Sequence, residues 1–573
     1  MLRRSLRLDK LGRARGRILC APLECRLPIH KRPVTWTATS APRSFSAKAP
    51  VVEGLNQSST SASPGDTIYA LSTAQGRAGI AVIRISGSSC LDIYRALCPG
   101  KSKTPPRPRY AAVRKLLDPQ SSESQPVLLD SEALVLYFPA PRTVTGEDVL
   151  ELHVHGGPAT VRAVLAAIPR CPSRGRIRYA EPGEFTKRAF INDRLDLAQV
   201  ESLSDTLAAD TEQQRRAAVR GNSGILGRTY EAWRQQLLLA RGEIEALIDF
   251  SEDQHFDESQ SDLLDSVTEQ INGMLHSIQL HEQGSQRSEL LRNGIRIALV
   301  GPPNVGKSSL MNMVVGREAS IVSGEAGTTR DIIEASLDIR GYLCSFADTA
   351  GFRSSSSDGT LNRSGVIGAV EKEGIRRAKQ KAQESDIVVV LASVEDGPSG
   401  PLICYDQETL GLASEARAYL IVVNKRDSIE SDTLDTLLEQ FRQVLARNND
   451  RLGSARLLTI SCKEAHAQSN GKDPGGIHEL MNSLVKIFSG MTEMPVDLQD
   501  LLGVTARQGQ LLAKCRRHLE DFVDEAESDG RGTEADSVLA AEYLRYAANC
   551  LARITGKGEA GDVEDVLGVV FEK

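Results

Sequence analysis

The organisation of this chain is decided by one stretch, Gly301-Pro302-Pro303-Asn304-Val305-Gly306-Lys307-Ser308. It fits the pattern G-x-x-x-x-G-K-[ST] of a phosphate-binding loop, in which backbone N–H groups converge on phosphate oxygens at the positive end of a helix. Residues Ile295–Val300 before it predict a strand, and Leu310–Val315 after it predict a helix. We expect Lys307 to contact the β- and γ-phosphates and Ser308 to bind Mg²⁺. The alternative is a glycine-rich turn without a ligand.

Further short segments follow this loop in the order that a guanine-nucleotide switch requires. The Thr329 hydroxyl should bind Mg²⁺, and Asp348 should hold Mg²⁺ through a water molecule. The Asp427 carboxylate suits the N1–H and 2-amino groups of guanine, which adenine lacks, so the segments predict GTP rather than ATP. The segments are Gly327–Asp331, Asp348–Gly351, Asn424–Asp427 and Ser461–Lys463. The expected nucleotide contacts are Asn304, Val305, Gly306, Lys307, Ser308, Ser309, Ser323, Thr328, Thr329, Asp348, Thr349, Ala350, Gly351, Asn424, Lys425, Asp427, Ser461, Cys462 and Lys463.

Two residues distinguish this predicted site from that of Ras-type GTPases. Phe352 follows Gly351, where the Ras type has a glutamine that orients the attacking water, and a phenyl ring cannot do this. Asn304 fits a class in which an asparagine carboxamide helps to hold K⁺, whose charge would stabilise the transition state in place of an arginine finger. Simple tolerance at a variable loop position is the open alternative for Asn304. We expect Asn304 and Lys307 to contribute to catalysis.

Length and composition predict an ordinary soluble protein with several domains. The 573 residues suggest about three or four domains, and 40% hydrophobic with 25% charged residues is ordinary for globular proteins. The net charge of −6 does not indicate a nucleic-acid binder, so any RNA contact must come from a local patch or a partner. No apolar run approaches the roughly 20 residues that span a bilayer. The ten cysteines include no C-x-x-C pair, which predicts reduced thiols and no zinc site.

The first fifty residues have the composition of a mitochondrial transit peptide. They contain nine Arg and three Lys against only Asp9 and Glu24. A basic tail that binds RNA without specificity is the alternative. Residues 51–65 form a Ser-rich linker without periodicity.

The remaining chain predicts a GTPase domain inserted into a helical region. Residues 66–190 mix strands and helices as an α+β domain does, and 191–291 show long amphipathic helical periodicity. Residues 292–490 alternate strand and helix as a parallel α/β sheet does, and 491–573 are helical again. The fold class is therefore multidomain α+β and α/β, with a discontinuous helical bundle and an inserted Ras-like P-loop GTPase domain. We hypothesise that nucleotide-dependent changes pass mechanically to the bundle.

Blocks in the N-terminal region add a family resemblance that covers almost the whole chain from about Thr67. Together with the GTPase motifs they resemble the MnmE family of tRNA-modification GTPases, and mitochondrial forms in particular. No other GTPase family known to us carries these N-terminal blocks. They are Ile83–Gly87, Thr145–Leu152, His155–Pro158, Pro182–Phe190 and Asn192–Gln199.

The resemblance implies a folate site and a homodimer. The domain at 66–190 would bind a tetrahydrofolate one-carbon donor of the 5,10-methylene or 5-formyl type and would form the dimer. Arg84, Glu151 and Arg194 match the family's folate-contacting positions. Cations suit the glutamate tail of folate and a carboxylate suits its pterin edge.

The resemblance also implies K⁺-dependent dimerisation of the GTPase domains and a partner. Asn304, Ser323, Glu325 and Thr328 match the K⁺-site positions, and Glu371 matches the acid that orients water indirectly. The partner would be an FAD protein similar to MnmG. Together they would modify C5 of the wobble uridine, U34, of certain tRNAs in the mitochondrial matrix.

The chain departs from the family pattern in two places. A Ser/Gly-rich insert at Ser354–Gly368 lengthens the second switch before Glu371. The family closes with Phe-Cys-(Ile/Val)-Gly-Lys, whereas this sequence closes with Phe571-Glu572-Lys573. We interpret the second difference as a clipped sequence; a GTPase that modifies tRNA poorly is the alternative. Two other functions are considered. One is a ribosome-assembly GTPase of the Era or Der type, and the other is a scaffold with a degenerate nucleotide site. The helical, mixed-charge segment after Pro495 and the complete GTPase motifs argue against them.

Overall fold

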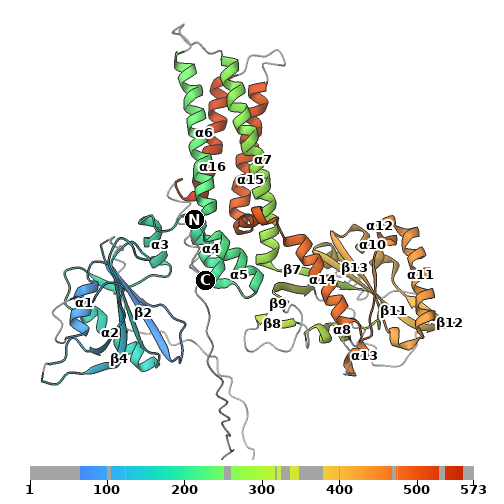
Figure 1. Cartoon of the computed structure of the whole chain (residues 1–573), viewed down its shortest axis with the longest axis horizontal. Helices are drawn as coiled ribbons and strands as arrows, with labels where there is room; N and C mark the ends of the chain where they lie inside the picture. Colours follow the sequence, from blue (N-terminus) through green and yellow to red (C-terminus); the bar gives the residue numbers. More distant parts are fainter. Residues whose placement is uncertain are drawn as a thin grey trace, which may run out of the picture. The chain divides into compact units, whose positions relative to one another are not determined.

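The computed structural model describes most of the chain outside its two ends and its switch regions (Figure 1). The predicted transit peptide at 1–50 and nearly all of the linker at 51–65 lie outside the described residues. Side chains at 247, 249–250, 260–262 and 321–323 are likewise not described. The described residues are 65–99, 105–122, 124–250, 260–315, 319–323, 336–347, 379–398, 400–467, 473, 475–527 and 536–558.

The N-terminal region is a six-stranded sheet with helices on one face, in the order β3-β4-β5-β2-β1-β6. Alternation along the strands sends Ile83 and Leu152 into the core with α1 and α2, while Arg84 and Glu151 take the opposite face. The predicted α+β architecture is therefore confirmed. The elements are β1 (Thr67–Leu71), β2 (Ile80–Ser86), α1 (Cys90–Leu97), β3 (Ala112–Leu117), β4 (Leu128–Phe138), β5 (Val149–His155), α2 (Pro158–Ala167), η1 (Ile168–Arg170), β6 (Ile177–Tyr179) and α3 (Glu184–Ile191).

The helical bundle combines two segments that are far apart in sequence. Its long helices α6, α7, α15 and α16 run side by side (Figure 1). Helix α16 presents buried alanines, among them Ala540, Ala547 and Ala548, and such small side chains allow close helix approach. None of the described helices combines the length and apolarity needed to cross a bilayer. The elements are α4 (Leu197–Ala208), α5 (Glu212–Gly221), α6 (Ile225–Phe250), α7 (Gln260–Asn293), η5 (Val496–Gly503), α15 (Ala506–Ala526) and α16 (Ser537–Thr555).

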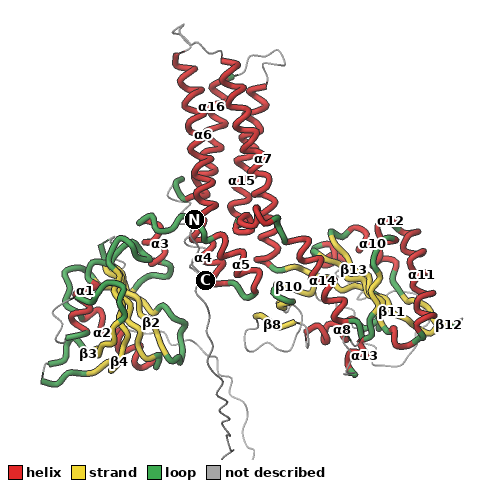
Figure 2. Tube along the Cα trace, in the orientation of Figure 1, coloured by secondary structure: helices red, strands yellow, loops and turns green. Residues whose placement is uncertain are grey.

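Between these helical segments in the sequence lies the predicted GTPase (G) domain, an eight-stranded sheet in the order β14-β13-β11-β7-β10-β9-β8, with β12 paired to β11. Helices cover both faces: Ile297 and Leu299 of β7 belong to the core with α8 and α14, while Ala298 and Val300 belong to the core with α10 and α11. Figure 2 shows both sheets and the helical segments. The strands are β7 (Ile295–Val300), β8 (Ala319–Ser323), β9 (Ser336–Ile339), β10 (Tyr342–Ala347), β11 (Ile387–Gly397), β12 (Gly400–Cys404), β13 (Ala418–Asn424) and β14 (Leu457–Thr459). The helices are α8 (Lys307–Met313), α10 (Gln407–Glu415), η4 (Arg426–Ser428), α11 (Ser431–Asn448), α12 (Asp450–Gly453), α13 (Cys462–His466) and α14 (Ile477–Thr492).

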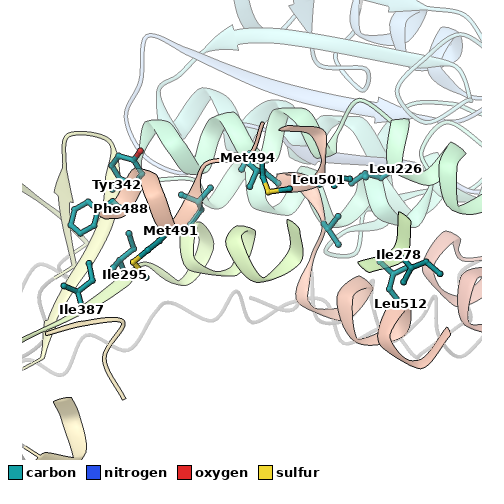
Figure 3. Close-up of a cluster of buried hydrophobic side chains, with 14 of the residues drawn as sticks. Leu226, Ile278, Ile295, Tyr342, Ile387, Phe488, Met491, Met494, Leu501 and Leu512 are labelled. Atoms are coloured by element: carbon teal, nitrogen blue, oxygen red, sulfur yellow. The ribbon is translucent and has the colours of Figure 1, made fainter. Parts of the chain in front are cut away.

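A single cluster of buried side chains includes both the G domain and the bundle (Figure 3). Phe488 of α14 packs against Tyr342 of β10, with ring centroids 5.5 Å apart. Met494, which follows α14, and Leu501 of η5 belong to the same cluster, as does Leu512 of the bundle helix α15. The inserted domain therefore does not have a core of its own on this side.

Candidate nucleotide-binding site

The phosphate-binding loop depends on backbone conformations that favour glycine. Gly301 and Gly306 have φ angles of 149° and 100°, and Asn304 has a φ of 63°. A Cβ on Gly301 would lie 2.1 Å from the carbonyl oxygen of Leu391. Gly306 is the residue before α8, so the helix begins at Lys307, three residues earlier than the sequence pattern predicted. The positive end of α8 therefore faces the loop directly.

Lys307 folds back over this loop. Its ammonium group donates hydrogen bonds to the carbonyl oxygens of Gly301 and Pro302, both at 2.7 Å. Burial lowers the pKa of Lys307, and the nearby Asp406 carboxylate opposes that shift. The loop thus holds a cation at the start of α8, as a site for phosphate oxygens requires.

Asn424 joins three predicted segments of the site. Its side-chain amide donates to the carbonyl oxygen of Val305 at 2.7 Å, and its oxygen accepts from the backbone N–H of Cys462 at 3.3 Å. Asn424 is almost fully buried at the end of β13. A side chain with one donor group and one acceptor group is needed here, because it connects the phosphate loop to the 461–463 segment.

Asp427 is held in a fixed orientation at the predicted base pocket. The Ser461 hydroxyl donates to one carboxylate oxygen of Asp427 at 2.6 Å, and the ammonium of Lys463 lies 3.9 Å from the other. The neighbouring Arg426 turns away and pairs with Glu464 at 3.0 Å. Since a carboxylate accepts several hydrogen bonds, Asp427 keeps acceptor capacity for the two N–H groups of a guanine edge.

The structure brings together the described part of the predicted nucleotide site. Asn304, Val305, Gly306, Lys307, Ser308 and Ser309 form the loop and the first turn of α8, and Asn424, Lys425, Asp427, Ser461, Cys462 and Lys463 form the base side. Ser323 ends β8, and its side chain is not described. The predicted residues Glu325, Thr328, Thr329, Asp348, Thr349, Ala350, Gly351 and Glu371, and the insert Ser354–Gly368, lie outside the described residues.

Only some of the predicted Mg²⁺ and K⁺ ligands are among the residues that the structure describes. Ser308 stands in the first turn of α8, where a hydroxyl fits the Mg²⁺ role of this motif. Asn304 lies in the loop with a left-handed backbone. Among the residues that the structure describes, no group of three or more His, Cys, Asp or Glu side chains is arranged to hold a metal ion.

Of the three predicted folate residues, Arg84 and Glu151 lie on the face of the N-terminal sheet opposite α1 and α2, whereas Arg194 follows α3. Arg84 and Glu151 are directly opposite each other in the β2–β5 register, and their side chains pair at 2.9 Å. His153 lies 3.4 Å from the second carboxylate oxygen of Glu151. Arg194 instead donates to the carbonyl oxygen of Thr143 at 2.9 Å. A cation and a carboxylate are thus adjacent and partly exposed, which fits a polar ligand edge.

Arg188, Glu147 and Glu184 of the N-terminal blocks form a largely buried ion-pair network with Arg178 and Asp66. Arg188 contacts Glu147 at 2.8 Å and Glu184 at 3.1 Å, and Arg178 contacts Glu184 and also Asp66 at 2.9 Å. Buried charges of this kind require partners, so removal of one member leaves another uncompensated. The network joins the Thr145–Leu152 block to the Pro182–Phe190 block.

Comparison with known proteins gives matches along nearly the whole chain. The model of the GTP-binding protein TrmE N-terminus matches residues 67–194, and the model of the MnmE helical domain matches residues 197–573. The mitochondrial 5-taurinomethyluridine-[tRNA] synthase subunit GTPB3 of Danio rerio is 35% identical over 89% of this chain and 92% of that protein. The tRNA modification GTPase MnmE of Parvibaculum lavamentivorans is 38% identical over 88% of this chain and 98% of its own length.

Two further similarities complete the comparison. The mitochondrial tRNA modification GTPase MSS1 of Saccharomyces cerevisiae is 36% identical over 88% of this chain and 92% of that protein. Among solved structures, the G domain of the FeoB iron transporter of T. maritima is 20% identical over 34% of this chain and 97% of its own, with a TM-score of 0.19. This last similarity is too low to bear on function.

Proposed function

Because this chain belongs to the MnmE family of tRNA modification GTPases, we propose that it hydrolyses GTP to GDP and phosphate in the modification of the tRNA wobble uridine. The observation that carries the proposal is the identity of 35–38% with such GTPases over nearly the whole of their length. The arrangement of Asp427 and Ser461 supports guanine as the base. The phosphate loop with Lys307 supports a nucleoside triphosphate.

The residues of the chain have distinct roles in this reaction. Lys307 and the loop N–H groups bind the β- and γ-phosphates and stabilise the charge that develops on transfer. Ser308 and Thr329 would hold Mg²⁺, and Asn304, Ser323, Glu325 and Thr328 would hold K⁺. These ions supply positive charge beside the phosphates. Glu371 orients the attacking water indirectly, in place of the glutamine that Phe352 replaces.

The wider assignment follows the family. The protein acts as a homodimer through residues 66–190, with a tetrahydrofolate derivative as one-carbon donor held by Arg84, Glu151 and Arg194. An FAD-dependent MnmG-like partner joins it to modify C5 of U34 in mitochondrial tRNAs, in the mitochondrial matrix. The composition of residues 1–50 and the mitochondrial relatives support this location.

Deletion of the gene should remove the C5 modification of the wobble uridine from mitochondrial tRNAs. The measurement is mass spectrometry of nucleosides from purified mitochondrial tRNA, before and after re-expression of the intact chain. Modified bases made by unrelated enzymes at other tRNA positions serve as the internal control. Unchanged wobble-uridine modification would reject the proposed function.

GTP turnover should be at least about tenfold faster in KCl than in NaCl at equal ionic strength, because a correctly placed cation stabilises transition-state charge. Asn304→Gly is the matched variant, since glycine tolerates the φ of 63° while the carboxamide is lost. We expect this variant to turn over in KCl at the NaCl rate of the wild type, with unchanged GDP affinity. Equal wild-type rates in both salts would exclude the K⁺ site.

A further inference from the structure

Strand β11 extends beyond its neighbours at the nucleotide-binding edge of the sheet. Its pairing with β7 ends at Val300↔Val390, and its pairing with β13 ends at Ser393↔Asn424. β11 nevertheless continues to Gly397, because β12 pairs back against it from Ser393↔Cys404 to Gly397↔Gly400. The β11–β12 hairpin therefore projects beside the loop that begins with Lys425.

This projection places a carboxylate next to the loop that contains Lys425 and Asp427. Glu395 lies two residues after Ser393 and so shares its strand face. The Ser393 hydroxyl donates to Oε1 of Glu395 at 3.0 Å, and the ammonium of Lys425 donates to the same oxygen at 3.2 Å. Ser393 is fully buried, so one end of this chain of contacts is fixed in the sheet. Sequence reasoning missed Glu395.

Lys425 occupies a constrained position in the candidate site. Its backbone has a φ of 63°, a conformation that is uncommon for residues other than glycine. It follows Asn424, which connects the loops, and precedes Asp427, which faces the base pocket. The lysine side chain leaves the loop between these two residues, and its end is held by Glu395.

We infer that Glu395 is a positioning residue for guanine-nucleotide binding, which acts by fixing Lys425 before the nucleotide arrives. The inference rests on the proposed GTP site. A free lysine side chain loses rotamer freedom when a ligand orders it, and a pre-formed contact removes part of that loss. No phosphate-loop residue takes part in the Glu395–Lys425 contact. The effect therefore falls equally on GDP and GTP affinity and leaves the chemical step unchanged.

The test is nucleotide binding by the full chain, with fluorescent N-methylanthraniloyl GDP and a matching non-hydrolysable GTP analogue. Glu395 and Lys425 are each 38% exposed, and such ion pairs contribute modestly. Glu395→Ala should therefore raise both Kd values about three- to fivefold, with kcat at saturating GTP within about twofold of the wild type. Asp396→Ala is the matched control, since Asp396 is the next, exposed acid on the same hairpin and should leave both values unchanged.

A double-mutant cycle separates positioning from a general effect on folding. In a Lys425→Met background, Glu395→Ala should have no additional effect on either Kd. An equal effect in both backgrounds would overturn the inference, and so would unchanged or tighter binding by Glu395→Ala alone. Failure of the wild-type chain to bind GDP would instead reject the proposed GTP site, so the two failures are distinguishable.

Discussion

Replacement of Asp427 by asparagine is expected to weaken GTP binding about a hundredfold or more and to create affinity for xanthosine triphosphate. In the proposed site the Asp427 carboxylate would accept hydrogen bonds from two N–H groups of guanine, and an amide NH₂ would face one of them with a donor. Each unsatisfied group costs about 1–3 kcal/mol, and about 1.4 kcal/mol is tenfold in affinity. Xanthine has a carbonyl in place of the 2-amino group and therefore suits the new donor.

The substitution should leave the fold intact. The hydrogen bond that Asp427 accepts from Ser461 at 2.6 Å needs only an oxygen, which asparagine retains. The measurement is competition of GTP and xanthosine triphosphate for the full-length protein. Asp432→Asn, at an exposed acid in the first turn of α11, makes the same chemical change away from the site and should bind GTP normally. Undiminished preference for GTP in Asp427→Asn would show that the base binds elsewhere.

Replacement of Lys307 by alanine is expected to lower kcat/KM for GTP about a hundred- to a thousandfold. The cation lies over the phosphate loop, and removal of one preorganised donor to a developing negative charge costs this much in other enzymes. Burial lowers the pKa of Lys307, and the nearby Asp406 carboxylate opposes that shift. Kinetics at several GTP concentrations, together with single-turnover rates, measure the loss.

Two further variants make this result interpretable. Lys486→Ala, at an exposed lysine on α14, removes the same charge away from the site and should leave kcat/KM unchanged. Lys307→Arg keeps the charge but changes the shape of the group that bonds Gly301 and Pro302, so it should restore little activity. If Lys307→Ala hydrolyses GTP at the wild-type rate, the 301–308 loop does not bind the reacting phosphates.

Sequence patterns predicted the strand before the phosphate loop because it depends on a local signal. Ile295–Val300 and Ala418–Asn424 are nearly continuous apolar runs, as buried parallel strands are. The start of α8 was placed three residues late, since the left-handed conformation of Gly306 is not visible in hydrophobic periodicity. The edge strand β3 was not predicted, because Arg114 and Lys115 interrupt its apolar pattern.

Contacts that depend on register between strands could not be derived from the sequence. The direct pairing of Arg84 with Glu151 requires the β2–β5 register, and the contact between Glu395 and Lys425 requires an extension of β11 beyond the sheet. The local sequence signal for the contact between Glu395 and Lys425 is weak. It consists of the turn-forming residues Gly397-Pro398-Ser399-Gly400 after the alternating Ser393-Val394-Glu395. That signal predicts a hairpin but not its partner.

The shared core around Phe488 and Leu501 has a thermodynamic consequence. Because buried side chains of the G domain and of the bundle belong to one cluster, unfolding of the G domain should expose part of the bundle core as well. A nucleotide at a hundred times its Kd stabilises the protein that binds it by about 2.7 kcal/mol, and that stabilisation is then distributed to helices that never contact the ligand. Trp233 packs beside Tyr230 within the bundle, so the midpoint of its fluorescence change on unfolding should shift when the phosphate loop binds nucleotide.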